Sequence, residues 1–71
     1  MDRYKQQKQQ EIYDLTVYLS SAYSDIGDWK IIKIYEARLQ GKEDPYDLEE
    51  LVAKRQAARD RINELQKELG E

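Results

Sequence analysis

The clearest pattern in the chain is a stripe of mostly apolar residues in its last third, spaced alternately by three and four residues. The stripe consists of Leu48, Leu51, Arg55, Ala58, Ile62, Leu65 and Leu69. This alternation is the seam of a heptad repeat, which lies along one side of a helix and packs against another helix. The pattern therefore predicts a helix over about 45–69 whose stripe is covered by other helices.

A second stripe with the same phase lies in the first third of the chain, at Ile12, Leu15, Leu19, Ala22 and Ile26. It predicts an N-terminal helix over about 5–22. The segment SSAYSDIGD then interrupts the pattern, and Gly27 lowers helix stability by roughly 1 kcal/mol relative to alanine. A break near Ser20–Asp28 and one long helix with a weak joint are both consistent with this segment. We favour the break, with the Ser24 hydroxyl capping the next helix.

The segment WKIIKIYEARLQG predicts another helix, over about 25–40, with Trp29, Ile32, Glu36 and Leu39 on one stripe. Gly41 suits the left-handed position that follows a helix. Residues 41–44 would then form the turn. Asp44 is a natural N-cap, Pro45 suits the first helical position, and Asp47 lies where a capping box places its acid.

A turn of about four residues forces the two helices that it joins to run antiparallel. The predicted fold is therefore all-α: an antiparallel helical hairpin of residues 25–40 and 45–69, with the N-terminal helix packed on it or extending from it. If Leu39 faces Leu48, Trp29 faces Ala58. Arg55 is the anomaly on the stripe, because an unpaired buried guanidinium is very costly. Either Glu36 pairs with Arg55, or Arg55 sends its charged end to water.

Length and composition fit a single small domain over 1–71. A core of this size supplies roughly 3–5 kcal/mol unless a disulfide, a metal or a second subunit adds to it. The chain has no cysteine and no histidine, so self-association or well-ordered helix packing remains. Charged residues make up 38% of the chain and the mean hydropathy is -1.01, which leans toward disorder, but the helical periodicity argues against it. The polar residues 1–11 are either frayed or an ordered start of the first helix.

Several function classes fit this sequence poorly. No histidine or cysteine is present to activate a serine or act as a nucleophile, and the pairs Asp25/Asp28 and Asp44/Asp47 fall at helix starts, where capping accounts for them. We predict a protein that is not an enzyme, with no cofactor, no metal and no small-molecule substrate. No apolar run is long enough for a membrane span, and residues 1–10 lack the apolar segment of a signal peptide. We expect a soluble protein of the cytoplasm.

The apolar stripes predict a non-enzymatic helical interaction or assembly module that forms a homo-oligomer or binds a partner protein, because too little of the chain is available to cover them. The residues predicted to form the interface are Leu15, Leu19, Trp29, Ile32, Leu51, Arg55, Ile62, Leu65 and Leu69. An alternative is a small nucleic-acid-associated or host-regulatory protein that uses Lys30, Lys33, Arg55 and Arg59. Scattered acidic residues and a net charge of -3 weaken this alternative. A third possibility is a monomeric three-helix bundle.

The segments DWKIIKIYEARLQG, PYDLEEL and KRQAARDRINEL resemble short, largely uncharacterised proteins encoded in bacterial phages and prophages. The resemblance covers about residues 25–66 and not the N-terminal third. The matching positions are Trp29, Lys30, Ile32, Lys33, Glu36, Pro45, Tyr46, Asp47, Arg55, Arg59, Asp60, Ile62, Asn63 and Leu65. The resemblance implies a phage-related origin, in the cytoplasm of a host cell, and it implies no particular activity.

Overall fold

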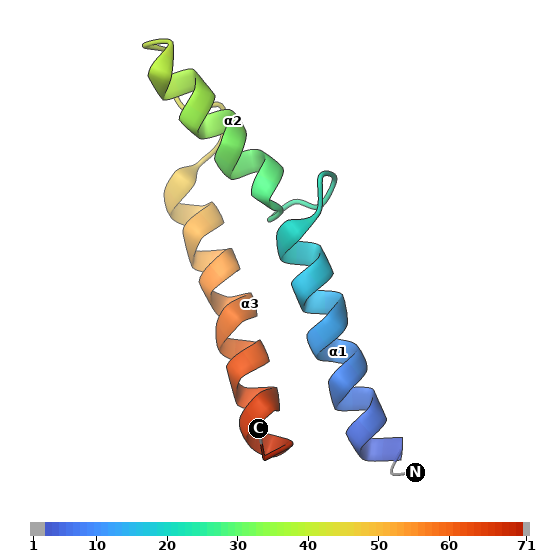
Figure 1. The fold of residues 1–71 in the computed structure, drawn as a ribbon. Coiled ribbons are helices and arrows are strands. Elements are labelled where there is room, and N and C mark those ends of the chain that lie inside the picture. Colours follow the sequence, from blue (N-terminus) through green and yellow to red (C-terminus); the bar gives the residue numbers. More distant parts are fainter. Residues whose placement is uncertain (1–2, 71) are drawn as a thin grey trace.

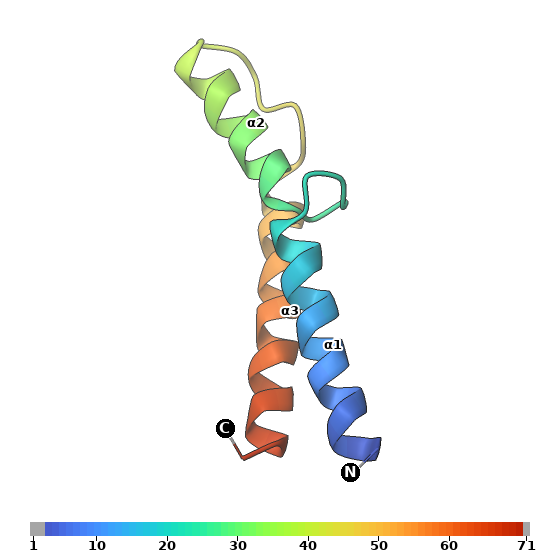
Figure 2. The same ribbon diagram turned by 45° about the vertical axis from the view of Figure 1, so that its right-hand side comes forward.

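The computed structural model describes residues 3–70, and this part of the chain forms three helices and no strand. They are α1 (Arg3–Ser20), α2 (Asp28–Leu39) and α3 (Leu48–Glu68), so the predicted all-α fold is confirmed. Figures 1 and 2 show α1 and α3 side by side and antiparallel, while α2 continues beyond the end of α1 along the long axis. The result is a rod with extents of 53 × 18 × 15 Å.

The heptad stripe of α3 faces the interior of the chain. Leu51, Ala58 and Leu65 are buried on α3, while Leu15 and Leu19 of α1 pack against the same core. Most contacts between helices join α1 to α3. The predicted hairpin of α2 and α3 is therefore realised only in part, and α1 covers most of the α3 stripe.

Residues 21–27 break the first two helices apart, as predicted. The loop is tight, because a Cβ atom on Gly27 would lie 2.2 Å from the backbone oxygen of Ser21, so only glycine fits. The predicted capping role of Ser24 is wrong. Its hydroxyl donates to the backbone oxygen of Tyr18, and the N-cap of α2 is Gly27, with no side-chain hydrogen bond.

The end of α2 follows the prediction. Gly41 has a φ of 72°, which is the left-handed conformation expected after a helix. The amide of Lys42 donates to the oxygen of Ala37, and the amide of Gly41 donates to the oxygen of Arg38. This pair of bonds is a Schellman motif, which satisfies carbonyls that the helix leaves free.

The predicted start of α3 is wrong by three residues. Asp47, not Asp44, is the N-cap, and its side chain accepts a hydrogen bond from the amide of Glu50. Asp44 instead accepts two hydrogen bonds from Arg38, both of 2.8 Å. Pro45 therefore lies in the linker and not at the first helical position.

The later start of α3 replaces a four-residue turn with a linker of eight residues, Gln40–Asp47. The linker returns beside α2 (Figure 2), and Tyr46 packs edge-on against Trp29, with ring centroids 5.6 Å apart. The linker thus occupies part of the position expected for α3. Leu39 is 69% exposed, contrary to its predicted position against Leu48. Ala58, the predicted neighbour of Trp29, is buried in the core.

The two aspartates of the linker offer a direct test of where α3 begins. Asp47→Ala removes the N-cap and is expected to lower the free energy of unfolding by about 1 kcal/mol. Asp44→Ala removes an exposed ion pair and is expected to cost less than the loss of the N-cap. Urea unfolding followed by circular dichroism measures both. A larger loss for Asp44→Ala would place the cap at Asp44.

Candidate interaction surface

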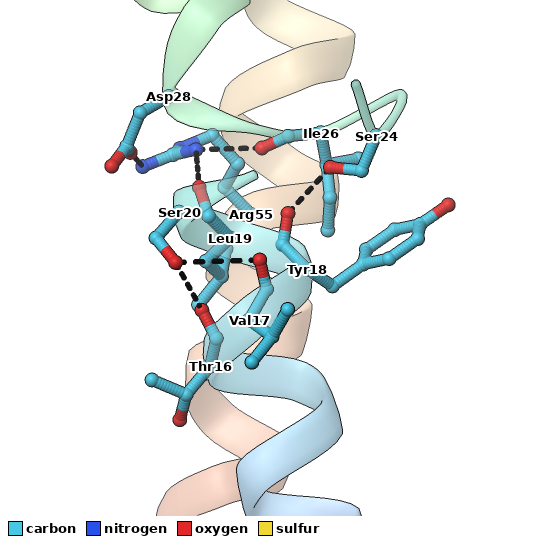
Figure 3. Close-up of polar contacts among 9 residues, drawn as sticks. All are labelled: Thr16, Val17, Tyr18, Leu19, Ser20, Ser24, Ile26, Asp28 and Arg55. Atoms are coloured by element: carbon cyan, nitrogen blue, oxygen red, sulfur yellow. Dashed lines mark hydrogen bonds and ion pairs between the residues drawn. The ribbon is translucent and has the colours of Figure 1, made fainter. Parts of the chain in front are cut away.

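Arg55 of α3 joins its helix to the end of α1, the loop and the start of α2, which lie 27 to 36 residues away in sequence. Its Nη1 atom donates to the backbone oxygens of Leu19 at 3.1 Å and Ile26 at 2.6 Å, and its Nη2 atom lies 2.6 Å from Oδ1 of Asp28. Figure 3 shows the guanidinium lying between the end of α1 and the loop that leads to α2. Arg55 thus pairs with Asp28, and not with Glu36 as one prediction had it.

The position of Arg55 explains why a charged residue stands on an apolar stripe. Its side chain is only 13% exposed, so the alternative in which its charge extends into water is also wrong. The last carbonyls of a helix have no partner within the helix, and a cation near them interacts favourably with the helix dipole. At the C-terminal end of α1, Arg55 donates to one of these carbonyls and places its positive charge near the negative end of the helix dipole.

Two ion pairs join α1 to α3 nearer the chain ends. Lys8 lies 2.7 Å from Glu68, and Nε of Arg61 lies 2.7 Å from Glu11. Burial lowers the pKa of Lys8, but hydrogen bonds to Glu68 and Tyr4 outweigh this and leave the pKa raised. The hydrogen bond from Lys8 lowers the pKa of Glu68. The antiparallel register of α1 and α3 is therefore held by charges as well as by the stripe.

Most residues predicted to form an interface lie inside this single chain. Leu51 and Leu65 are buried; the half-buried members are Leu15, Leu19, Trp29, Arg55, Ile62 and Leu69. Ile32 is the exception, with 53% of its surface exposed. The structure brings Leu15, Leu19 and Leu51 together in one core, where α1 supplies the cover that was expected from another chain.

Ile32 and four further apolar residues are left uncovered. Ile32, Tyr35 and Leu39 of α2 are 53%, 63% and 69% exposed, and Tyr13 and Val17 of α1 are 65% and 46% exposed. We call these five residues the outer face. Ile32 and Leu39 lie on the stripe that was predicted to face the other helix of the hairpin, so this prediction is wrong for these two residues. Tyr35 lies beside them at helical spacing.

The outer face points away from α3 on both helices. On α2, Ile34 is buried in the core with Leu51, and Ile32, Tyr35 and Leu39 lie on the opposite side by helical geometry. On α1, Leu15 and Leu19 pack into the core, and Tyr13 and Val17 lie on the far side. On each of the two helices, the residues of the outer face therefore lie on the side opposite the core.

An open hollow of about 290 Å³ lies where α2, the linker and α3 meet, lined in part by Asp25, Asp47 and Glu50. The charged nitrogen of Lys30 lies 4.8 Å from the ring centre of Tyr46 and 5.7 Å from that of Trp29. Lys30 thus makes cation–π contacts with both rings. These contacts hold the linker against α2.

The four residues of the proposed basic face do not form one free patch. The guanidinium of Arg55 is bonded within the chain, and Lys30 lies against two aromatic rings. Lys33 and Arg59 are exposed. Only part of this set is placed where it could contact a phosphate.

Residues 3–70 contain no group of three His, Cys, Asp or Glu side chains that could hold a metal ion. Within the same residues, none of the helices has the length and apolar character needed to cross a membrane. A scan against models of protein families finds no match, and the searches of curated proteins and of solved structures find no similar protein.

The bonds of Arg55 predict a large loss of stability when it is replaced. Arg55→Met leaves the oxygens of Leu19 and Ile26 without their donor, at a cost of about 2 kcal/mol or more. Asp28→Asn removes only the ion pair, whose acid is 53% exposed, and should cost under about 1 kcal/mol. Urea unfolding at one protein concentration measures both. Equal losses would show that the carbonyl bonds contribute nothing.

The Lys8–Glu68 pair predicts a specific loss of stability in acid. Because the pKa of Glu68 is lowered in the folded chain, its contribution is present above pH 4.5, the usual value, and is lost as the pH falls through the folded value. Melting temperatures at pH 7 and pH 3 should therefore differ less in Glu68→Gln than in the original chain. Lys8→Met should have the same effect. An unchanged difference in both variants would contradict a role for this pair.

Proposed function

We propose that this chain is a non-enzymatic helical assembly module that works by burying its outer face, with a second copy of itself or with a partner protein. The observation that carries the proposal is the imbalance between its core and its exposed apolar surface. Among residues 3–70, only Ile26, Ile34, Leu51, Ala58 and Leu65 are buried hydrophobic residues, whereas nine large hydrophobic residues are exposed.

The shape of the molecule explains this imbalance. At the level of α1 the rod is two helices thick, so each helix has one covered side and one open side. Beside α2 the cover is mainly the linker. A core this small supplies roughly 3–5 kcal/mol, so covering further apolar surface would add substantially to stability.

Exposed apolar residues are common as single positions, and only a contiguous group carries meaning. Ile32, Tyr35 and Leu39 form such a group on one side of α2. Tyrosine suits a surface that is wet in the free chain and buried in a complex, because its ring is apolar and its hydroxyl is polar. The outer face contains two of them, Tyr13 and Tyr35.

A phage-related setting is part of this proposal and rests only on the resemblance of residues 25–66 to short phage and prophage proteins. The nucleic-acid alternative has less support, because Arg55 is engaged within the chain. Assembly is therefore the function that the geometry supports best.

Light scattering tests the proposal. The chain has a mass of 8.5 kDa, and at high concentration we expect a multiple of this mass. Tyr35→Glu places a charge on the outer face at a position that is 63% exposed, so the monomer should keep its helix content while the mass falls to 8.5 kDa. Val52→Glu is the control, since Val52 is 49% exposed but lies on α3.

The control should keep the mass of the original chain. A mass of 8.5 kDa for the original chain at every concentration would contradict self-association. An equal effect of Tyr35→Glu and Val52→Glu would contradict the assignment to the outer face.

A further inference from the structure

We infer that α2 and the linker form a flap that opens reversibly from α3 as one unit, while α1 and α3 stay paired. The flap comprises residues 28–47, and its opening uncovers Leu48 and Leu51 at the start of the heptad stripe. This inference goes beyond the proposed function, because it concerns contacts within a single chain.

Side-chain contacts hold the two parts of the flap to each other. Arg38 of α2 donates two hydrogen bonds to Asp44 of the linker. The ring of Tyr46 packs edge-on against Trp29, and the charged nitrogen of Lys30 lies 4.8 Å from the centre of the Tyr46 ring. Because these contacts lie inside the flap, α2 and the linker keep them only by moving together.

The flap is joined to α3 by one ion pair and one apolar anchor. Within residues 3–70, the ion pair is that of Asp28 with Arg55 at 2.6 Å, and the side chain of Asp28 is 53% exposed. The anchor is Ile34, which is 4% exposed and shares a core with Leu51. Ile31 of the flap is only partly buried against the same core. The attachment of the flap to α3 is therefore small.

The helix α1 ends before it reaches the first turn of α3. Arg55 donates to the backbone oxygen of Leu19, and the last residue of α1 is Ser20, so α1 ends beside Arg55. Leu48 and Leu51 lie further along α3, beyond the end of α1 and at the level of α2 (Figure 1). The start of the stripe is therefore covered by the flap and not by α1.

The contacts between α1 and α3 do not involve the flap. Lys8 pairs with Glu68 and Glu11 pairs with Arg61, at the far end of the rod from α2. Leu65, on the same part of the stripe, is 1% exposed. Opening the flap leaves all of these contacts in place, so the pair of α1 and α3 stays closed.

The helix α2 has little stability of its own. It has 12 residues, and its N-cap, Gly27, makes no side-chain hydrogen bond. Isolated helices shorter than about 12–15 residues are marginal in water. Once it leaves α3, α2 therefore loses its helical hydrogen bonds, and its backbone amides exchange with solvent.

Hydrogen exchange followed by NMR tests the inference, because exchange reports local opening. The two sets of amides are those of residues 32–39 in α2 and those of residues 58–65 in α3. In the original chain we expect protection factors at least about tenfold lower for the α2 set. The same difference is expected in Tyr35→Glu, which removes any protection that comes from association through the outer face.

Two matched variants decide whether the flap opens separately. Ile62→Val alters the part of the stripe that α1 covers, which the open form keeps intact. It should therefore speed exchange of the α3 set about threefold and leave the α2 set unchanged. Ile34→Val alters a contact that is lost both on opening and on global unfolding, so it should speed both sets by the same factor, about threefold.

The contradicting results are equally specific. Equal protection of the two sets in the original chain would show that the chain opens only as a whole, and would overturn the inference. An equal acceleration of both sets by Ile62→Val would overturn it too. Self-association is measured separately: a chain that stays at 8.5 kDa in light scattering would contradict the proposed function and leave this inference standing.

Discussion

The fold depends on how the guanidinium of Arg55 is held. Two backbone oxygens, one at the end of α1 and one in the loop, and the carboxylate of Asp28 all converge on it. A guanidinium offers several donors in a rigid plane, which a lysine does not. This one side chain of α3 therefore fixes where α1 ends and where α2 begins. Gly27, which has no Cβ atom, allows the backbone of the loop between them to turn tightly.

The constraint at Arg55 also determines what the molecule exposes. With α1 closed against α3 and α2 directed beyond the end of α1 (Figure 1), one side of α2 has no helix over it. The linker covers another side through Tyr46 and Trp29. The same arrangement that satisfies the buried polar groups therefore leaves Ile32, Tyr35 and Leu39 exposed, and this connects the interior of the chain to its proposed role in assembly.

The sequence predicts the helices from their periodicity, and it predicts less well which residues contact one another. The helices, the break after Ser20, the left-handed Gly41 and the seam of α3 follow from local spacing and turn chemistry. The start of α3 does not, because Asp44 and Asp47 are both good caps and the choice depends on Arg38 binding Asp44. That difference of three residues lengthens the linker, and the stripe of α3 packs against α1 instead of α2.

The partner of Arg55 and the outer face needed the three-dimensional arrangement. Glu36 and Asp28 are both acids on the predicted second helix, and only the position of the loop decides between them. A heptad seam is equally consistent with a partner in the same chain or in another chain. Within residues 3–70 the stripe of α3 is covered by α1, so the proposed assembly surface lies on the other side of the helices.

The dependence of thermal unfolding on protein concentration tests the central claim most directly. If the outer face is buried only in an assembly, folding is coupled to association, and the melting temperature should rise steadily as concentration increases over about a hundredfold range. A melting temperature that is constant over that range would show that the single chain is already as stable as it becomes, and would contradict the account.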